Sequence, residues 1–204
     1  CYLSQNPGTR LEFIPYIESA LKTPNVRIRH SSVNDRGIIS SKPHSVGELI
    51  TNVDYYSIIS GELAGLAREN ARNGFLSKSI DKLINDLIQI DYGQYLVPSP
   101  SISFIINHSC NPNAAFVCFG NDNYEFRALK LISKDEEISF DYSTVIGDEF
   151  ILQCRGSEEE CRGFAGRPLI MSGKEMGKIL ARYPKGWLLP YIERELREPY
   201  SDDK

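Results

Sequence analysis

The chain has 204 residues, 41% of them hydrophobic and 25% charged, a composition typical of a globular domain and unlike that of a disordered segment. Its 27 acidic side chains outnumber its 23 lysines and arginines, and the net charge of −4 argues against a dedicated nucleic-acid binder. A basic partner fits this charge better. No apolar run predicts a membrane span and the first residues lack a signal-peptide pattern, so we expect an intracellular protein, cytoplasmic or nuclear.

The first half of the chain combines short predicted strands with a helical stretch. Residues 1–25 carry three prolines around an apolar patch and predict an irregular arm or a single helix packed on the domain. From residue 26 onward, the runs VRIRH, GIIS and VGELI are separated by turn residues, a rhythm typical of strands. Residues 62–90 instead show apolar residues at i, i+3 and i+4 spacing around an Asn-Gly turn, which predicts two helices.

The second half returns to strands and ends in helices. IQIDYGQYLV alternates like a strand, and AAFVCF, YEFRALKLI and EEISFDY predict three more, separated by polar turns. A helix is expected after Ser172 and another from Pro190, because each position starts an amphipathic stretch with a typical helix-start residue. The pattern predicts a mainly β fold with a helical insertion, an α+β arrangement of small sheets with C-terminal helices.

The cysteines do not form a disulfide pattern. There are five, an odd number, and residues 2–109 contain none. We therefore expect reduced thiols or a metal site. Their positions are Cys1, Cys110, Cys118, Cys154 and Cys161.

Four short motifs in a fixed order carry the functional information. They are Asp35-Arg36-Gly37, the segment NHSCNPN at 107–113, Asp141-Tyr142 at the end of EEISFDY, and the cysteine pair Cys154 and Cys161 followed by Arg-Gly. Taken together, they resemble the SET-domain lysine methyltransferases over about residues 26–166. The resemblance implies a SET-domain fold of small β-sheets.

This resemblance also implies a division of the chain. The N-terminal arm would span 1–25, and the SET domain 26–146 with its helical insertion at about 62–90. A post-SET-like segment would span 147–171, and a C-terminal helical extension 172–204.

The family uses S-adenosylmethionine, and the resemblance assigns cofactor contacts. Asn107 and His108 stand where the family binds the methionine end, through main-chain groups and the Asn side chain. Arg36 and Gly37 stand at the family's Gly-x-Gly turn, where a residue without Cβ permits close approach. Asp35 replaces the first glycine of that turn.

Methyl transfer from a sulfonium to an amine is an in-line displacement that needs positioning more than acid-base groups. The amine must be deprotonated, which an aromatic channel favours because burial lowers the pKa of a lysine. By the resemblance, Tyr142 is the catalytic tyrosine that also borders the cofactor, and Tyr95, or alternatively Tyr92, supplies the opposite wall. Without the resemblance, Tyr142 would be an ordinary tyrosine at a strand end.

The family's post-SET cysteines, Cys-x-Cys-x4-Cys, bind one zinc together with the cysteine of NHSC. Gly156 replaces the middle cysteine here, leaving Cys110, Cys154 and Cys161. Structural zinc sites are nearly always four-coordinate, and we find no natural fourth ligand. Free thiols are the alternative. The resemblance further implies that Phe150, Phe164 or both close over the adenine.

Residues 100–106 lack the Arg and the Gly-Asn pair that many histone-directed members carry before NHSC. We therefore expect a protein-lysine N-methyltransferase acting on a non-histone or unknown basic, lysine-containing segment, with specificity in the insertion. Two alternatives stay open: a catalytically inactive SET-like binding module, and a SET-like enzyme recruited to small-molecule biosynthesis.

Overall fold

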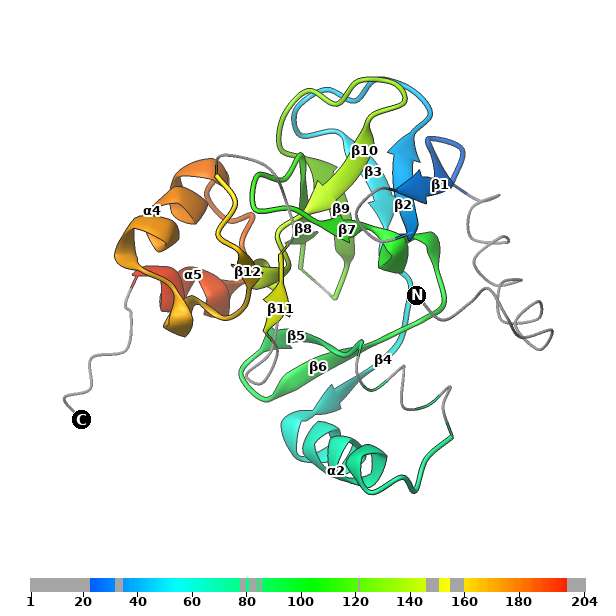
Figure 1. Cartoon of the computed structure of the whole chain (residues 1–204), viewed down its shortest axis with the longest axis vertical. Coiled ribbons are helices and arrows are strands. Elements are labelled where there is room, and N and C mark those ends of the chain that lie inside the picture. Colours follow the sequence, from blue (N-terminus) through cyan, green and yellow to red (C-terminus); the bar gives the residue numbers. More distant parts are fainter. Residues whose placement is uncertain are drawn as a thin grey trace.

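The structure is a computed structural model, and it describes residues 23–31, 35–77, 80, 84, 86–120, 122–145, 151–154 and 160–197. Most of the predicted N-terminal arm and of the second predicted helix lies outside these residues. Figure 1 shows small sheets at the centre, the insertion at the bottom and the C-terminal helices on the left.

A four-stranded sheet holds the motifs. Its order is β1-β2-β10-β7, formed by Val26–Ser31, Asp35–Ser40, Glu137–Phe140 and Asn107–His108. The β1, β2 and β10 strands are antiparallel neighbours, whereas β7 runs parallel to β10. Strands far apart in the sequence thus become neighbours, which places the second and third motifs side by side.

A three-stranded antiparallel sheet forms much of the core. Its order is β3-β9-β8, formed by Leu49–Asn52, Tyr124–Ala128 and Ala114–Cys118. All residues of β8 except the last are buried, as expected for a strand covered on both faces. Phe116 and Phe126 are paired across the strands and pack edge to face with ring centroids 5.6 Å apart.

The described residues between 55 and 98, which include the predicted insertion and are called the insertion from here on, contain their own sheet and helix. The sheet order is β4-β6-β5, formed by Tyr55–Ser60, Gln94–Pro98 and Ile88–Asp91, and helix α2 spans Gly61–Arg72. The sequence analysis missed β4 and treated IQIDYGQYLV as one strand. It is a hairpin, because Gly93 takes φ of +65°, a turn conformation that glycine adopts without strain.

A small second hydrophobic cluster stabilises the insertion. Its buried members are Ala64, Ile84, Leu87 and Tyr95. The Ser60 side chain caps α2 by accepting a hydrogen bond from the Leu63 N–H. We call the four buried residues Ala64, Ile84, Leu87 and Tyr95 the insertion cluster.

The C-terminal part pairs two short strands with two helices. Strands β11 and β12 are Leu152–Gln153 and Phe164–Ala165, and helices α4 and α5 are Gly173–Arg182 and Pro190–Arg197. Both helices begin where the sequence predicts, and α4 has a full capping box between Ser172 and Glu175. The remaining elements are 3₁₀ helices: η2 (Ile102–Ile105), η3 (Tyr142–Thr144) and η4 (Pro168–Ile170).

Both C-terminal helices pack on the main core. Tyr191 of α5 is fully buried, and its hydroxyl donates to the Gln89 carbonyl of β5. The fold is mainly β with a helical insertion and C-terminal helices, as predicted. In the part of the chain described, no helix is long and apolar enough to cross a membrane.

Candidate active site

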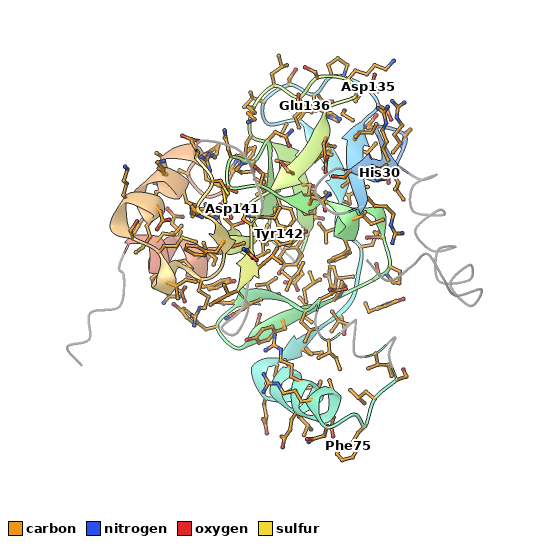
Figure 2. The ribbon with its side chains drawn as sticks, viewed as in Figure 1. His30, Phe75, Asp135, Glu136, Asp141 and Tyr142 are labelled. Carbon is orange, nitrogen blue, oxygen red and sulfur yellow. The ribbon has the colours of Figure 1, made fainter. Side chains whose placement is uncertain are left out.

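The parallel pairing of β7 with β10 brings the two most specific motifs together. Asn107 lies opposite Ser139, and His108 lies opposite Phe140. Asp141 and Tyr142 follow directly at the end of β10. Figure 2 shows Asp141 and Tyr142 near the middle of the molecule, whereas Phe75 lies at the far tip of the insertion.

The last residue of NHSCNPN, Asn113, ties this motif to β10. Its Nδ2 donates to the Glu136 side chain at 2.9 Å and to the Glu137 carbonyl at 2.8 Å. Its Oδ1 accepts from the Ser139 N–H at 2.9 Å. Asn113 is buried, and every hydrogen-bonding side of its amide is used. The motif alone did not predict this role of Asn113.

Asn107 and Gly37 meet at the other end of the motif. The Asn107 Nδ2 donates to the Arg36 carbonyl at 2.9 Å and to Glu137 Oε1 at 2.7 Å. A Cβ on Gly37 would lie 2.4 Å from Glu137 Oε1 and 3.0 Å from Asn107 Nδ2. A side chain at position 37 would therefore displace the Glu137 carboxylate from its place beside the Asn107 amide.

His108 is buried beside both motifs. Its Nδ1 accepts a hydrogen bond from the Tyr142 N–H at 3.1 Å, so the proton of the neutral ring lies on Nε2. Nε2 is 3.3 Å from the Cys110 sulfur and donates to it. Burial lowers the pKa of His108, although the nearby Asp141 carboxylate acts in the opposite direction. The ring is therefore neutral near pH 7.

Tyr142 packs against His108 and is held by its own hydroxyl. The ring centroids of Tyr142 and His108 are 5.3 Å apart, and the phenol donates to the Ile106 carbonyl at 2.8 Å. Burial raises the pKa of Tyr142, with a further contribution from the Asp86 carboxylate. The phenol therefore stays protonated at physiological pH, and its oxygen lone pairs can accept a hydrogen bond.

A buried ion pair joins the Asp-Tyr motif to the C-terminal segment. Arg162 binds Asp141 through two parallel hydrogen bonds of 2.6 and 2.8 Å. The Asp141 side chain is 0% exposed and that of Arg162 is 7% exposed. Arg162 also donates to the Ser143 hydroxyl at 3.1 Å. The Arg-Gly after Cys161 is thus a structural link that the sequence analysis did not assign.

The predicted zinc cysteines gather in the same region. One ligand atom from each of His108, Cys110 and Cys154 lies within 4.8 Å of the other two, and the Cys161 sulfur is 3.4 Å from that of Cys154. Burial raises the pKa of the Cys110 thiol to about 12, so only a cation would make it a thiolate at neutral pH. A set of three soft sulfur donors suits zinc.

Two cavities adjoin these groups. The first, about 240 Å³, is lined by residues of NHSCNPN, by Glu136 and Glu137 of the β10 segment, and by Cys154 and Cys161. The second, about 290 Å³, lies between the cysteines and α4 and is lined by charged side chains such as Lys178 and Arg182. The first cavity is the candidate cofactor site, because the predicted contacts Asn107 and His108 both line it.

The structure does not place Tyr95 with Tyr142. Tyr95 is buried in the insertion cluster, where the Arg68 guanidinium stacks on its ring at 4.7 Å. The alternative residue, Tyr92, is half exposed and packs against Tyr191 of α5 with ring centroids 5.8 Å apart. The resemblance that suggested Tyr95 carries no information about which hydrophobic cluster this residue joins.

The predicted adenine-covering aromatics are only partly described. Phe164 is partly buried against the main core, and its carbonyl lies 3.9 Å from the Cys110 sulfur. Phe150 lies outside the described residues. Their predicted roles stay predictions.

Comparison with known proteins agrees with the motifs. A family model described as "SET domain" matches residues 35–143, just over half of the chain. A histone-lysine N-methyltransferase of Arabidopsis thaliana, ATX2, is 27% identical over 138 residues, which make up 65% of this chain. The match covers only 12% of the length of ATX2. The chain belongs to the SET-domain family.

Proposed function

We propose that this chain is an S-adenosylmethionine-dependent protein-lysine N-methyltransferase. The observation that supports it most is the β7–β10 pairing, which puts Asn107 and His108 on a cavity and Tyr142 directly against His108. Membership of the SET family supports the reaction class. The fold alone would not, because one fold can host unrelated functions.

The cofactor would be held by groups that line the first cavity. Asn107 and His108 would contact its methionine end, as the family resemblance implies, with Arg36 and Gly37 at the neighbouring turn. When bound, S-adenosylmethionine supplies an electrophilic methyl group. The exposed acceptors of this cavity, which include Glu137, suit a ligand that carries positive charge.

Tyr142 would orient the substrate amine rather than deprotonate it. Its O–H is already donated to the Ile106 carbonyl, so the phenol oxygen offers lone pairs to an N–H of the incoming lysine. A neutral phenol with a raised pKa cannot act as a base near pH 7. The amine would thus be deprotonated before or during entry into the site, and positioning supplies most of the catalysis.

A basic, lysine-containing segment is the proposed substrate. The chain has a net charge of −4, and the carboxylate of Asp86 acts electrostatically on the Tyr142 phenol. A negative charge beside this phenol favours the approach of a cationic side chain. A non-histone substrate remains our proposal because residues 100–106 differ from the histone-directed pattern. Such a reaction would take place in the cytoplasm or nucleus.

We also propose that Cys110, Cys154 and Cys161 hold a zinc ion. The ion would fix the C-terminal segment to the NHSC turn and supply no chemistry to the transfer. His108 would remain a hydrogen-bond donor to the Cys110 sulfur, since its Nδ1 already accepts from the Tyr142 N–H.

Calorimetric titration of S-adenosylmethionine and S-adenosylhomocysteine into the purified chain tests the cofactor site. We expect saturable binding that Asn107→Ala removes. Asn70→Ala, on the exposed face of α2, is the matched control and should bind normally. Absence of binding to the folded wild-type protein at millimolar ligand would overturn the proposed function.

A further inference from the structure

The second cavity, between the cysteines and α4, is lined by polar and charged groups. Among the described residues, no aliphatic or aromatic side chain lines its volume of about 290 Å³. Sites for drug-sized ligands are lined mostly by hydrophobic and aromatic side chains. A ligand of this cavity would therefore be small and hydrophilic. We call it the α4 cavity, and its charged lining residues are Glu160, Arg162, Lys174, Glu175, Lys178 and Arg182.

Positive charge predominates in the α4 cavity. Four of its charged lining side chains are cationic and two are carboxylates, whereas the whole chain has a net charge of −4. A cavity lined by an excess of one sign of charge concentrates ions of the opposite sign. The α4 cavity therefore favours an anion, although the protein as a whole repels one.

Both carboxylates of this lining are already bound within the protein. Glu175 forms the capping box at the start of α4. The Glu160 carboxylate accepts a hydrogen bond from Arg182 at 3.2 Å. In the part of the chain that the structure describes, no ion pair involves Lys174 or Lys178. The charges of these two lysines are therefore left for a ligand.

The cations of the α4 cavity come from two segments. Lys174, Lys178 and Arg182 follow one another at intervals of four residues, so their side chains lie on one face of α4. Arg162 comes from the segment before α4, and its side chain is 7% exposed. Its other nitrogens bind Asp141, but its buried Nε has no hydrogen-bond acceptor among the described residues. The positive charge thus comes from side chains along the whole helix and from a buried arginine, not from the helix end.

We propose that the α4 cavity binds a phosphate group, either as inorganic phosphate or as a phosphate monoester. Lysine and arginine bind phosphate oxygens through charge-assisted hydrogen bonds. The described lining has no apolar surface on which a nucleobase or an acyl chain could pack. The inference goes beyond the proposed function, because neither Asn107 nor His108 lines this cavity.

A bound phosphate group would join α4 to residues 160–162. Arg182 already links these segments, because it donates to the Cys110 carbonyl at 2.8 Å as well as to Glu160. A dianion placed among the four cations would offset their mutual repulsion. Because the ligand binds the folded protein and not the unfolded chain, it should also raise Tm.

Calorimetric titration of inorganic phosphate and of O-phosphoserine into the purified chain tests the inference. Serine is the control ligand, and sodium chloride keeps the ionic strength constant so that screening is the same throughout. We expect saturable binding at one site per chain for at least one of the two phosphate ligands, and none for serine. The tighter of the two identifies the source of the phosphate group. Absence of saturable binding of both at millimolar concentrations would overturn the inference.

Three lysine variants locate the bound anion. Lys178→Gln should weaken phosphate binding by about fivefold, the effect of losing one exposed ion pair. Lys185→Gln removes an exposed lysine outside both cavities, and Lys130→Gln removes the lysine that lines the first cavity. Both should leave the affinity unchanged. An equal loss in Lys185→Gln would indicate a nonspecific effect of net charge, and an equal loss in Lys130→Gln would place the anion in the first cavity. Either result would overturn the inference.

Glu160→Gln separates anion binding from a structural effect. It removes a negative charge from the lining and releases Arg182, so phosphate should bind about fivefold more tightly. If Glu160 only maintained the shape of the cavity, its replacement would weaken binding instead. Unchanged or weaker phosphate binding in Glu160→Gln would therefore count against the phosphate site and overturn it.

Discussion

Replacing Arg162 with alanine should destabilise the protein strongly. Asp141 would be left 0% exposed without its counter-charge, having lost both hydrogen bonds from the guanidinium. Breaking a buried ion pair by removing one partner costs about 3–5 kcal/mol. At about 2–4 °C per kcal/mol for a chain of this size, Tm should fall by about 6–20 °C.

Urea unfolding followed by circular dichroism measures this loss. Arg197→Ala is the matched control, because Arg197 pairs with Glu193 on an exposed face of α5, where the loss should be about 0.3–0.5 kcal/mol. The double variant Arg162→Ala/Asp141→Asn should lose less than the sum of the two single variants, by about 1 kcal/mol or more. Additive losses, or a loss for Arg162→Ala as small as that of the control, would refute the role of this pair.

Three further predictions concern transfer, pH and metal. Tyr142→Phe removes the hydroxyl that is proposed to orient the amine and should lower the rate of transfer about 100-fold, measured by mass spectrometry, with cofactor affinity nearly unchanged; unaltered transfer would contradict its role. His44 is fully buried with Nδ1 3.5 Å from the Glu48 carboxylate, and burial lowers its pKa although Glu48 acts in the opposite direction. As the pH falls, the unfolded chain takes up a proton on this histidine before the folded protein does, so the free energy of unfolding should decrease below about pH 6.5, by up to about 1.4 kcal/mol per pH unit. His44→Leu should flatten this pH dependence in thermal melts. An equally steep pH dependence of Tm for that variant would count against the prediction. Elemental analysis should find about one zinc per chain, retained in Cys118→Ser and lost in Cys161→Ser, with a chelator lowering Tm; a metal-free wild-type protein with the same Tm would rule out the zinc site.

Local signals in the sequence predicted several elements well. The N-cap at Ser172 and the start of a helix at Pro190 both depend on residues within one helical turn, and both agree with the structure. The helix predicted from residue 62 is α2, which begins at Gly61. The turn at Gly93 was missed because alternation continues across it, so a hairpin looked like one strand.

The parts of the site that sequence could not predict are those made by distant residues. Hydrogen bonds of the site join segments that lie 21 to 106 residues apart in the sequence. They occur in the Asp141–Arg162 pair and in the group formed by Ser31, Gly37, Asn107 and Glu137. Residue types and local spacing do not predict which distant segments pair. Tyr95 illustrates the same limit, since its place in the insertion cluster could not be predicted from the sequence.

The measurement that tests the central claim most directly is mass spectrometry of a lysine-peptide library after incubation with the protein and S-adenosylmethionine carrying a labelled methyl group. A matched library with arginine in place of lysine serves as the control. We predict label on lysine-containing basic peptides, none on the arginine library, and loss of label with Tyr142→Phe. Saturable cofactor binding without label on any lysine peptide would contradict the account and leave a SET-domain protein that binds without transferring to lysine.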